Sequence, residues 1–185
     1  MMQTNPQAGV KKWSLRAAAL LLLLGACTSS APSLITFATE SGATQYFFPM
    51  MEWEIGKNSV SAICDITYRH EPGSGAVCNI SFTAAGKTDI SPPALPSVLY
   101  FTADGIPYAV RDISLLFHNV EHQQTRITSI LDGDDLLAVL RSASITLNAL
   151  IDGKEYQYTP PKRFLLYRDK FLENLANRDR LDAEN

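Results

Sequence analysis

Two histidines and a glutamate in the middle of the chain have the types and spacing that could do chemistry. His118, Glu121 and His122 follow the order His-x-x-Glu-His. Imidazole nitrogens bind Zn²⁺, and a neighbouring carboxylate can activate a metal-bound water for hydrolysis. On a helix, His118 and His122 would share a face, because residues four apart lie one above the other. On that condition, the spacing is compatible with a zinc hydrolase.

The flanking residues favour a different structure. Segments 113–117 and 125–130 are rich in apolar and β-branched residues, which favours strands. The motif resembles that of the inverted zinc metallopeptidases, and this resemblance implies two histidine ligands and a glutamate base. However, that family is much larger, and no later helix here offers an acidic third ligand. We expect the motif at a strand end and in the following loop, in solvent, with no metal bound. A small metal-dependent hydrolase is the alternative.

Other patterns of catalysis are weaker still. The chain contains no Gly-x-Ser-x-Gly elbow and no Gly-rich phosphate loop after a strand. Asp132, Asp134 and Asp135 lie close together, but their spacing does not match a calcium-binding EF-hand loop. The sequence therefore predicts no catalytic residue and no cofactor.

The N-terminus carries a more specific pattern. Three basic residues precede an apolar run over 17–24, which is followed by the small residues Gly25 and Ala26 and by Cys27. A basic region, a short apolar core and a small-residue cleavage site are typical of a secretory leader. The segment resembles the signal peptides of bacterial lipoproteins. This resemblance implies that residues 1–26 are removed and that the Cys27 thiol carries a diacylglycerol. An ordinary secreted protein and a retained anchor are the alternatives.

The same resemblance implies an address in the bacterial cell envelope. Thr28, a residue other than Asp after the cysteine, implies passage to the outer membrane. Residues 27–33 comprise the lipidated cysteine and a tether of six residues, which reaches only about 20 Å when extended, so the domain should stay close to its membrane. Behind it we expect a single β-rich domain over 34–177 and a flexible tail over 178–185.

Two cysteines remain once the lipid-modified one is set aside. Apolar and polar residues alternate over 60–70 and 76–83, with turn-forming residues between them, which predicts a β-hairpin. Cys64 and Cys78 fall on its apolar face, and we expect them directly opposite each other. An even number of cysteines in an exported chain predicts a disulfide. Two buried thiols that never oxidise are the alternative.

The charge balance excludes some partners. The chain has 16 basic and 19 acidic residues, and loss of the three basic residues of the leader gives a net charge of −6. Nucleic-acid phosphates require clustered Lys and Arg, so we expect no nucleic-acid partner. Membrane attachment would come from acyl chains instead of charge.

Short β segments dominate the rest of the chain. Asp104-Gly105 and Asp152-Gly153 each separate two such segments and predict tight hairpins, because this dipeptide readily adopts positive φ. The sequence predicts a mainly β fold, either an antiparallel β-sandwich or a β-rich α+β domain.

Two segments are predicted to be helical. Residues 134–142 begin with acidic residues and end near Arg141, which suits a short helix. Residues 163–177 carry apolar side chains at helical spacing, which predicts a C-terminal helix. The first part of that segment, 163–167, is also compatible with a last strand.

The most apolar stretch after the leader runs over 46–53 and is rich in aromatic residues. We expect two strands that meet at Pro49 and contribute to the core, the alternative being an exposed patch for a partner. Together, these features predict a lipid-anchored envelope protein that acts by binding, with an envelope protein as a possible partner. A carrier of a hydrophobic ligand is a further alternative.

Overall fold

Alternation of apolar and polar residues builds most of this chain into β-structure, since successive side chains of a strand point to opposite faces. The computed structural model describes residues 33–40, 43–55, 60–71, 74–84 and 92–183. Residues 32–185 form one unit. The predicted leader, the lipidated Cys27 and the tether up to residue 32 lie outside the described residues.

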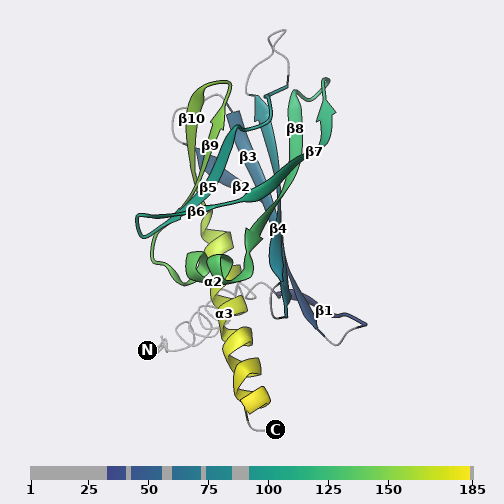
Figure 1. Ribbon diagram of the computed structural model, residues 1–185, viewed down its shortest axis with the longest axis vertical. Helices are drawn as coiled ribbons and strands as arrows, with labels where there is room; N and C mark the ends of the chain where they lie inside the picture. The colour runs from purple at the N-terminus through teal and green to yellow at the C-terminus, as the bar shows by residue number, and fades with distance from the viewer. Residues whose placement is uncertain (1–32, 41–42, 56–59, 72–73, 85–91, 184–185) are drawn as a thin grey trace, which may run out of the picture. The chain divides into compact units, whose positions relative to one another are not determined.

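Ten strands and two helices lie among the described residues (Figure 1). They are β1 (Ile35–Ala38), β2 (Thr44–Ile55), β3 (Val60–His70), β4 (Gly75–Ala84), β5 (Val98–Ala103), β6 (Ile106–Ala109), β7 (Arg111–Asn119), β8 (Gln124–Asp132), α2 (Gly133–Arg141), β9 (Ile145–Ile151), β10 (Lys154–Thr159) and α3 (Lys162–Ala183).

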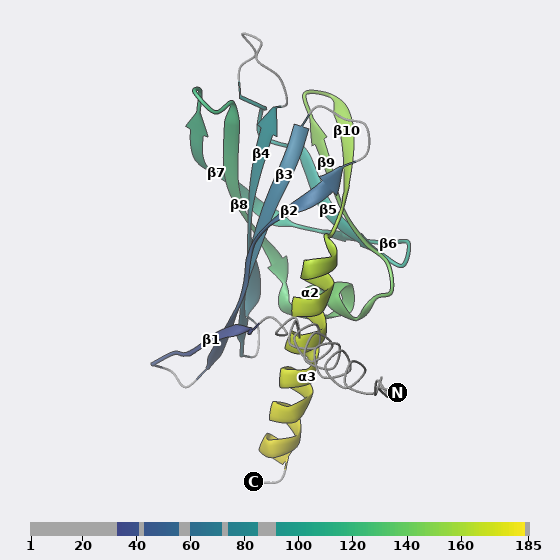
Figure 2. The same ribbon diagram turned by 180° about the vertical axis from the view of Figure 1, so that it is seen from behind.

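The strands form a single antiparallel sheet in the order β6-β5-β9-β10-β2-β3-β4-β8-β7, and β1 adds to β2. Only Val110 separates β6 from β7, so the two margins of the sheet follow each other along the chain. The sheet therefore curls until it is nearly closed (Figures 1 and 2). The mainly β prediction is confirmed, and the β-rich α+β alternative describes the fold better than a two-sheet sandwich.

Both Asp-Gly turns form as predicted. Asp104 and Gly105 have φ of 49° and 84°, and Asp152 and Gly153 have φ of 51° and 71°. Positive φ at both central residues matches the right-handed twist of the flanking strands, which is why such turns join β5 to β6 and β9 to β10.

The aromatic stretch belongs to β2, which is one strand and not two. Its pairing with β3 shifts between Phe48 and Met51, so Pro49 and Met50 lie in a β-bulge. Proline has no N–H to donate to a ladder, and a bulge accommodates it without ending the strand. The core interpretation is confirmed for four buried side chains, namely Tyr46, Phe48, Met51 and Trp53.

Helix α2 lies close to the predicted bounds. The Asp132 carboxylate caps it by accepting the backbone N–H of Asp134 at 3.0 Å, which satisfies one of the free donors of the first turn. Leu136, Val139 and Leu140 are buried on its inner side. Asp132 therefore caps this helix, and Asp134 and Asp135 lie in its first turn.

Helix α3 is longer than predicted. It begins at Lys162, so residues 163–167 are helical, and it continues to Ala183, six residues into the segment that the sequence analysis assigned to a flexible tail. The sequence after residue 177 lacks apolar periodicity, but its residues continue the helix, and Asp179 lies 3.8 Å from the His70 imidazole. This last part of α3 has no apolar stripe, but it contacts β3 through Asp179 and His70.

The inner face of the sheet packs on α3 around aromatic rings. The Phe171 ring lies 5.0 Å from that of Tyr46, 5.4 Å from Phe48 and 5.6 Å from Tyr68. About two helical turns earlier, the Phe164 ring lies 5.1 Å from that of Trp53. The interior of the curled sheet is therefore filled by side chains.

Candidate functional site

The His-x-x-Glu-His segment lies at the end of β7 and in the turn that follows it. The His118 Nδ1 atom lies 2.9 Å from the Thr125 hydroxyl on β8, and the backbone N–H of His122 donates to the Asn119 side chain at 3.1 Å. The predicted strand-end position is confirmed. Because the segment is not helical, the two imidazoles do not share a helical face. Among the described residues, no group of three or more His, Cys, Asp or Glu could hold a metal ion.

The structure corrects the predicted disulfide. The β3–β4 hairpin forms, but Cys64 lies opposite Ile80 and Cys78 lies opposite Ile66, two residues away from the predicted register. A shift of two keeps every apolar side chain on the same face, so alternation alone cannot fix the register. Both cysteines are buried as free thiols.

Burial also changes the chemistry of these thiols. Removal from water disfavours the thiolate and raises the pKa of Cys64 well above its usual range and that of Cys78 to about 12. Buried, protonated thiols are poor nucleophiles and poor metal ligands. The pair belongs to the packed core and not to a reactive site.

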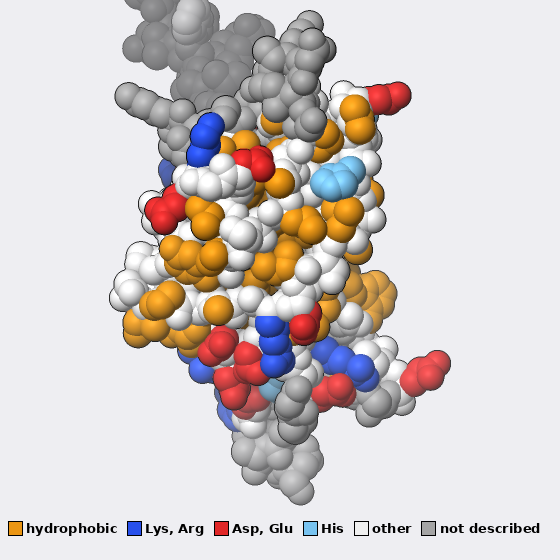
Figure 3. Space-filling view, turned by 45° about the horizontal axis from the view of Figure 1, so that its top comes forward, with side chains coloured by type: hydrophobic (Ala, Val, Ile, Leu, Met, Phe, Trp, Pro, Cys, Tyr) orange, Lys and Arg blue, Asp and Glu red, His pale blue; other side chains and the backbone are white. Residues whose placement is uncertain are grey.

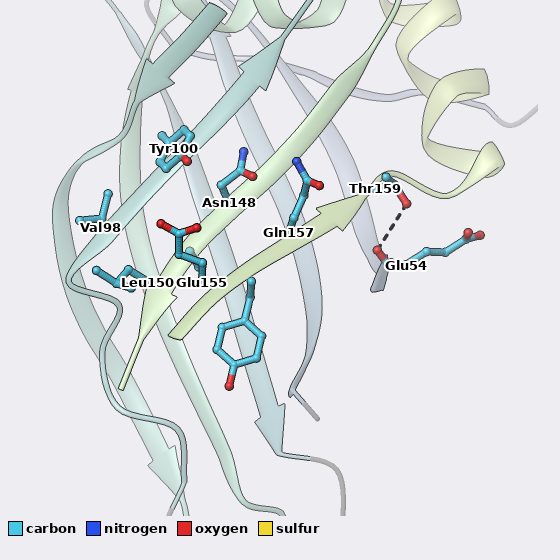
Figure 4. Close-up of a pocket in the computed structure, with 10 residues that line it drawn as sticks. Glu54, Val98, Tyr100, Asn148, Leu150, Glu155, Gln157 and Thr159 are labelled. Atoms are coloured by element: carbon cyan, nitrogen blue, oxygen red, sulfur yellow. Dashed lines mark hydrogen bonds between the residues drawn. The ribbon is translucent and has the colours of Figure 1, made fainter. Parts of the chain in front are cut away.

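The structure places its candidate site elsewhere, on the outer face of the sheet. A groove of about 780 Å³ crosses β5, β9 and β10 and reaches the end of β2 (Figure 4). Its volume lies within the range of about 300–1,000 Å³ that ligand pockets occupy. It is lined by Glu54, Val98, Tyr100, Asn148, Ala149, Leu150, Glu155, Tyr156, Gln157 and Thr159.

Strand register brings the groove residues together. Across the Asp152-Gly153 turn, Glu155 lies opposite Leu150 and Gln157 lies opposite Asn148. On the other side of β9, Asn148 lies opposite Tyr100. Polar side chains from three neighbouring strands therefore meet on one face.

Asn148 is the most constrained of these side chains. It is only 8% exposed, and its amide nitrogen donates to the hydroxyls of Thr102 at 2.9 Å and Thr146 at 3.2 Å. These two bonds use both amide hydrogens, and Figure 4 shows the amide oxygen turned toward Gln157. The groove thus holds a fixed hydrogen-bond acceptor.

The groove has an acidic character. Glu155 points along it toward Tyr100, whereas the Glu54 side chain turns outward at the rim (Figure 4). Thr159 donates to the Glu54 carbonyl at 3.4 Å, which joins β10 to β2 at this rim. None of the described lining residues is basic, so the groove is suited to a ligand that carries hydrogen-bond donors.

The sequence analysis did not predict this groove, although the polar residues that β9 and β10 contribute to it could have been inferred from the sequence. Thr146, Asn148 and Gln157 occupy the polar positions of the two strands that flank the Asp152-Gly153 turn. A two-residue turn fixes the register of its strands, and that register places Asn148 beside Gln157. The sequence could not predict that Tyr100 lines the groove, because β5, which carries it, pairs with β9, a strand far along the chain.

An apolar surface is a second feature that the sequence did not predict. Leu115, Leu116 and Phe117 on β7 are 43%, 50% and 43% exposed, and Val120 in the following turn is 73% exposed. Figure 3 shows hydrophobic side chains gathered on the face that carries β6 and β7. The ladder with β8 shifts on both sides of Ser114 and Leu115, and such bulges hinder edge-to-edge pairing of strands.

The chain was compared with protein families, with curated proteins and with solved structures. No protein-family model, no curated protein and no solved structure matched the chain. In the described part of the chain, neither helix combines the length and the apolar character needed to span a bilayer.

Proposed function

We propose that this chain is a lipid-anchored protein of the bacterial cell envelope whose β-rich domain binds a ligand or an envelope partner without catalysis. The observation that carries the binding role is the outer groove, where Asn148, Tyr100, Glu155 and Gln157 present hydrogen-bonding groups from three strands. Concave sites with a few fixed polar groups are the usual places for ligands. The outer face is favoured over the interior because aromatic side chains fill the interior.

The leader sequence supports the anchoring part of the proposal. Residues 24–27 resemble a lipobox, and acyl chains on Cys27 would hold the domain at the membrane, with Thr28 favouring the outer membrane. Replacing Cys27 with Ala should leave an unprocessed or soluble protein. Mass spectrometry of the membrane-extracted chain would detect the diacylglycerol, and an unmodified Cys27 in a membrane-bound protein would contradict lipidation.

Site-specific photocrosslinking in cells tests the groove. A photoreactive residue at Gln157 should capture a discrete species, and the additional substitution Asn148→Leu should weaken that capture by removing the fixed acceptor. The matched control is a photoreactive residue at Val77, which is 38% exposed on the outer face of β4. Equal capture at Gln157 and Val77, or capture unaffected by Asn148→Leu, would contradict binding in the groove.

Metal analysis separates this proposal from the hydrolase alternative. The purified protein should hold no stoichiometric zinc, because His118 and His122 lie on a strand and a turn without a third ligand among the described residues. Stoichiometric zinc that disappears when both histidines are replaced with Ala would contradict the non-catalytic role.

A further inference from the structure

Apolar side chains are exposed where the described chain begins. Ile35 and Phe37 on β1 are 50% and 59% exposed. Ile35 lies opposite Phe47 on β2, and the Phe37 and Phe47 rings meet edge to face at 5.4 Å. We call Ile35, Phe37 and Phe47 the β1 cluster. It lies on the outer face of the sheet, since its neighbours in sequence, Tyr46 and Phe48, are buried on the inner face.

The chain itself limits how far the β1 cluster can lie from the predicted anchor. Ile35 lies eight positions after Cys27 in the sequence. A fully extended chain spans at most about 3.6 Å per residue, so eight steps of the chain can separate the Cα atoms of Ile35 and Cys27 by no more than about 29 Å. The β7–β8 turn lies at the other end of the sheet from β1 in both views (Figures 1 and 2).

The surroundings of the β1 cluster suit a lipid headgroup region. Gln45 lies opposite Phe37, and Thr67 lies opposite Phe47, so the adjacent outward positions are polar but uncharged. Arg69, the next outward residue of β3, pairs with Glu71 at 3.0 Å, which balances its charge. Anionic headgroups would therefore meet little repulsion from these neighbours.

We infer that the β1 cluster inserts into the interface of the bilayer that holds the Cys27 acyl chains. This inference rests on the proposed lipid anchor. The anchor keeps the cluster within reach of the bilayer surface, and there the exposed side chains of Ile35 and Phe37 leave water for the boundary between headgroups and acyl chains. The domain would then have a fixed orientation, with β1 toward the membrane and the β7–β8 turn away from it.

Tryptophan quenching by brominated lipids tests this orientation. The chain has two tryptophans, of which Trp13 lies in the leader, and Trp53 is only 1% exposed and serves as the buried background. Phe37→Trp in the full, lipidated protein places a reporter in the β1 cluster. Val120→Trp is the matched control, because Val120 is exposed in the β7–β8 turn. Each protein is reconstituted in phosphatidylethanolamine and phosphatidylglycerol vesicles with and without bromine on the acyl chains.

The Phe37→Trp reporter should lose about half of its emission in brominated vesicles, whereas Trp53 alone and Val120→Trp should lose almost none. Quenching that is equal for the two reporters, or absent for both, would overturn the inference. Mass spectrometry of the same samples separates the two proposals. An acylated Cys27 with an unquenched Phe37→Trp reporter refutes only the membrane contact, whereas an unmodified Cys27 refutes the anchor and the inference together.

Discussion

The Arg126 guanidinium on β8 donates to the Asp65 carboxylate on β3 at 2.5 Å, across the intervening strand β4. The same guanidinium donates to Ser81 of β4 at 2.9 Å, and Asn79 of β4 donates to the other Asp65 oxygen at 2.8 Å. One network of four side chains thus joins three strands on the outer face of the sheet.

Replacing Arg126 with Met should lower the free energy of unfolding by about 1–3 kcal/mol, because Asp65 keeps its charge but loses its cation in a largely buried place. The two side chains are only 18% and 17% exposed. Urea unfolding measures the loss. Arg111→Met is the control, since Arg111 and Asp132 lie 4.0 Å apart and are 63% and 54% exposed. That change should cost no more than about 0.5 kcal/mol, and equal losses would contradict the role of the network.

Cys64 and Cys78 should react slowly with an alkylating reagent in the folded protein and rapidly in urea. Burial raises the pKa of both thiols, and that of Cys78 to about 12, so the reactive thiolate is scarce at mildly alkaline pH. Mass spectrometry after timed alkylation gives the rates. If the two residues took up no reagent even in urea until a reductant was added, a disulfide would be present and the free-thiol arrangement would be wrong.

The Asp104 carboxylate should make the free energy of unfolding decrease as the pH falls into the acidic range. Its carboxylate accepts backbone N–H groups of Ser144 at 2.8 Å and Ala143 at 3.1 Å, and these bonds lower its pKa. A carboxyl whose pKa is lower in the folded state stabilises the fold above the unfolded pKa of about 3.9, and this stabilisation is lost as the pH falls through the folded pKa.

Asp104→Asn keeps the turn and one acceptor but removes the charge, so the mutant should lose stability at neutral pH and approach the wild type in acid. Thermal unfolding as a function of pH measures the difference. Asp152→Asn, in the other Asp-Gly turn, controls for the effect of the amide on positive φ. A stability difference that stays constant from neutral to acidic pH would refute the carboxylate's role.

The packing of helix α3 should depend strongly on one aromatic side chain, that of Phe171. Phe171→Ala should lower the free energy of unfolding by about 3–5 kcal/mol, because it leaves a cavity between α3 and three aromatic rings of β2 and β3. Leu166→Ala, at a position 55% exposed on the same helix, should cost about 0.5 kcal/mol or less. Denaturant unfolding compares them, and similar losses would show that α3 does not pack as described.

Local patterns predicted the elements of this fold because their causes are local. Alternation placed Ile66 and Phe82 on buried faces, and two Asp-Gly pairs fixed two hairpins. The acidic residues after Asp132 predicted α2 for the same reason.

Features that depend on distant pairing were not predictable. A shift of two residues in the β3–β4 register preserves alternation, so the sequence could not decide whether Cys64 lies opposite Cys78 or Ile80. The pairing of β5 with β9, which brings Tyr100 to Asn148, joins residues 48 positions apart. No local pattern encodes that distance, and the groove was missed for this reason.

The single residue between β6 and β7 has a consequence for how the sheet assembles. Since β6 pairs with β5 and β7 pairs with β8, a slip of β7 by one residue along β8 would pull β6 by the same amount along β5. A slip of one residue exchanges the two faces of a strand, so an error in register at one margin would be accompanied by an error at the other. Val110 thus couples two registers that hydrogen bonding alone would leave independent. The one-residue link between β6 and β7 also limits how far the two margins of the sheet can separate.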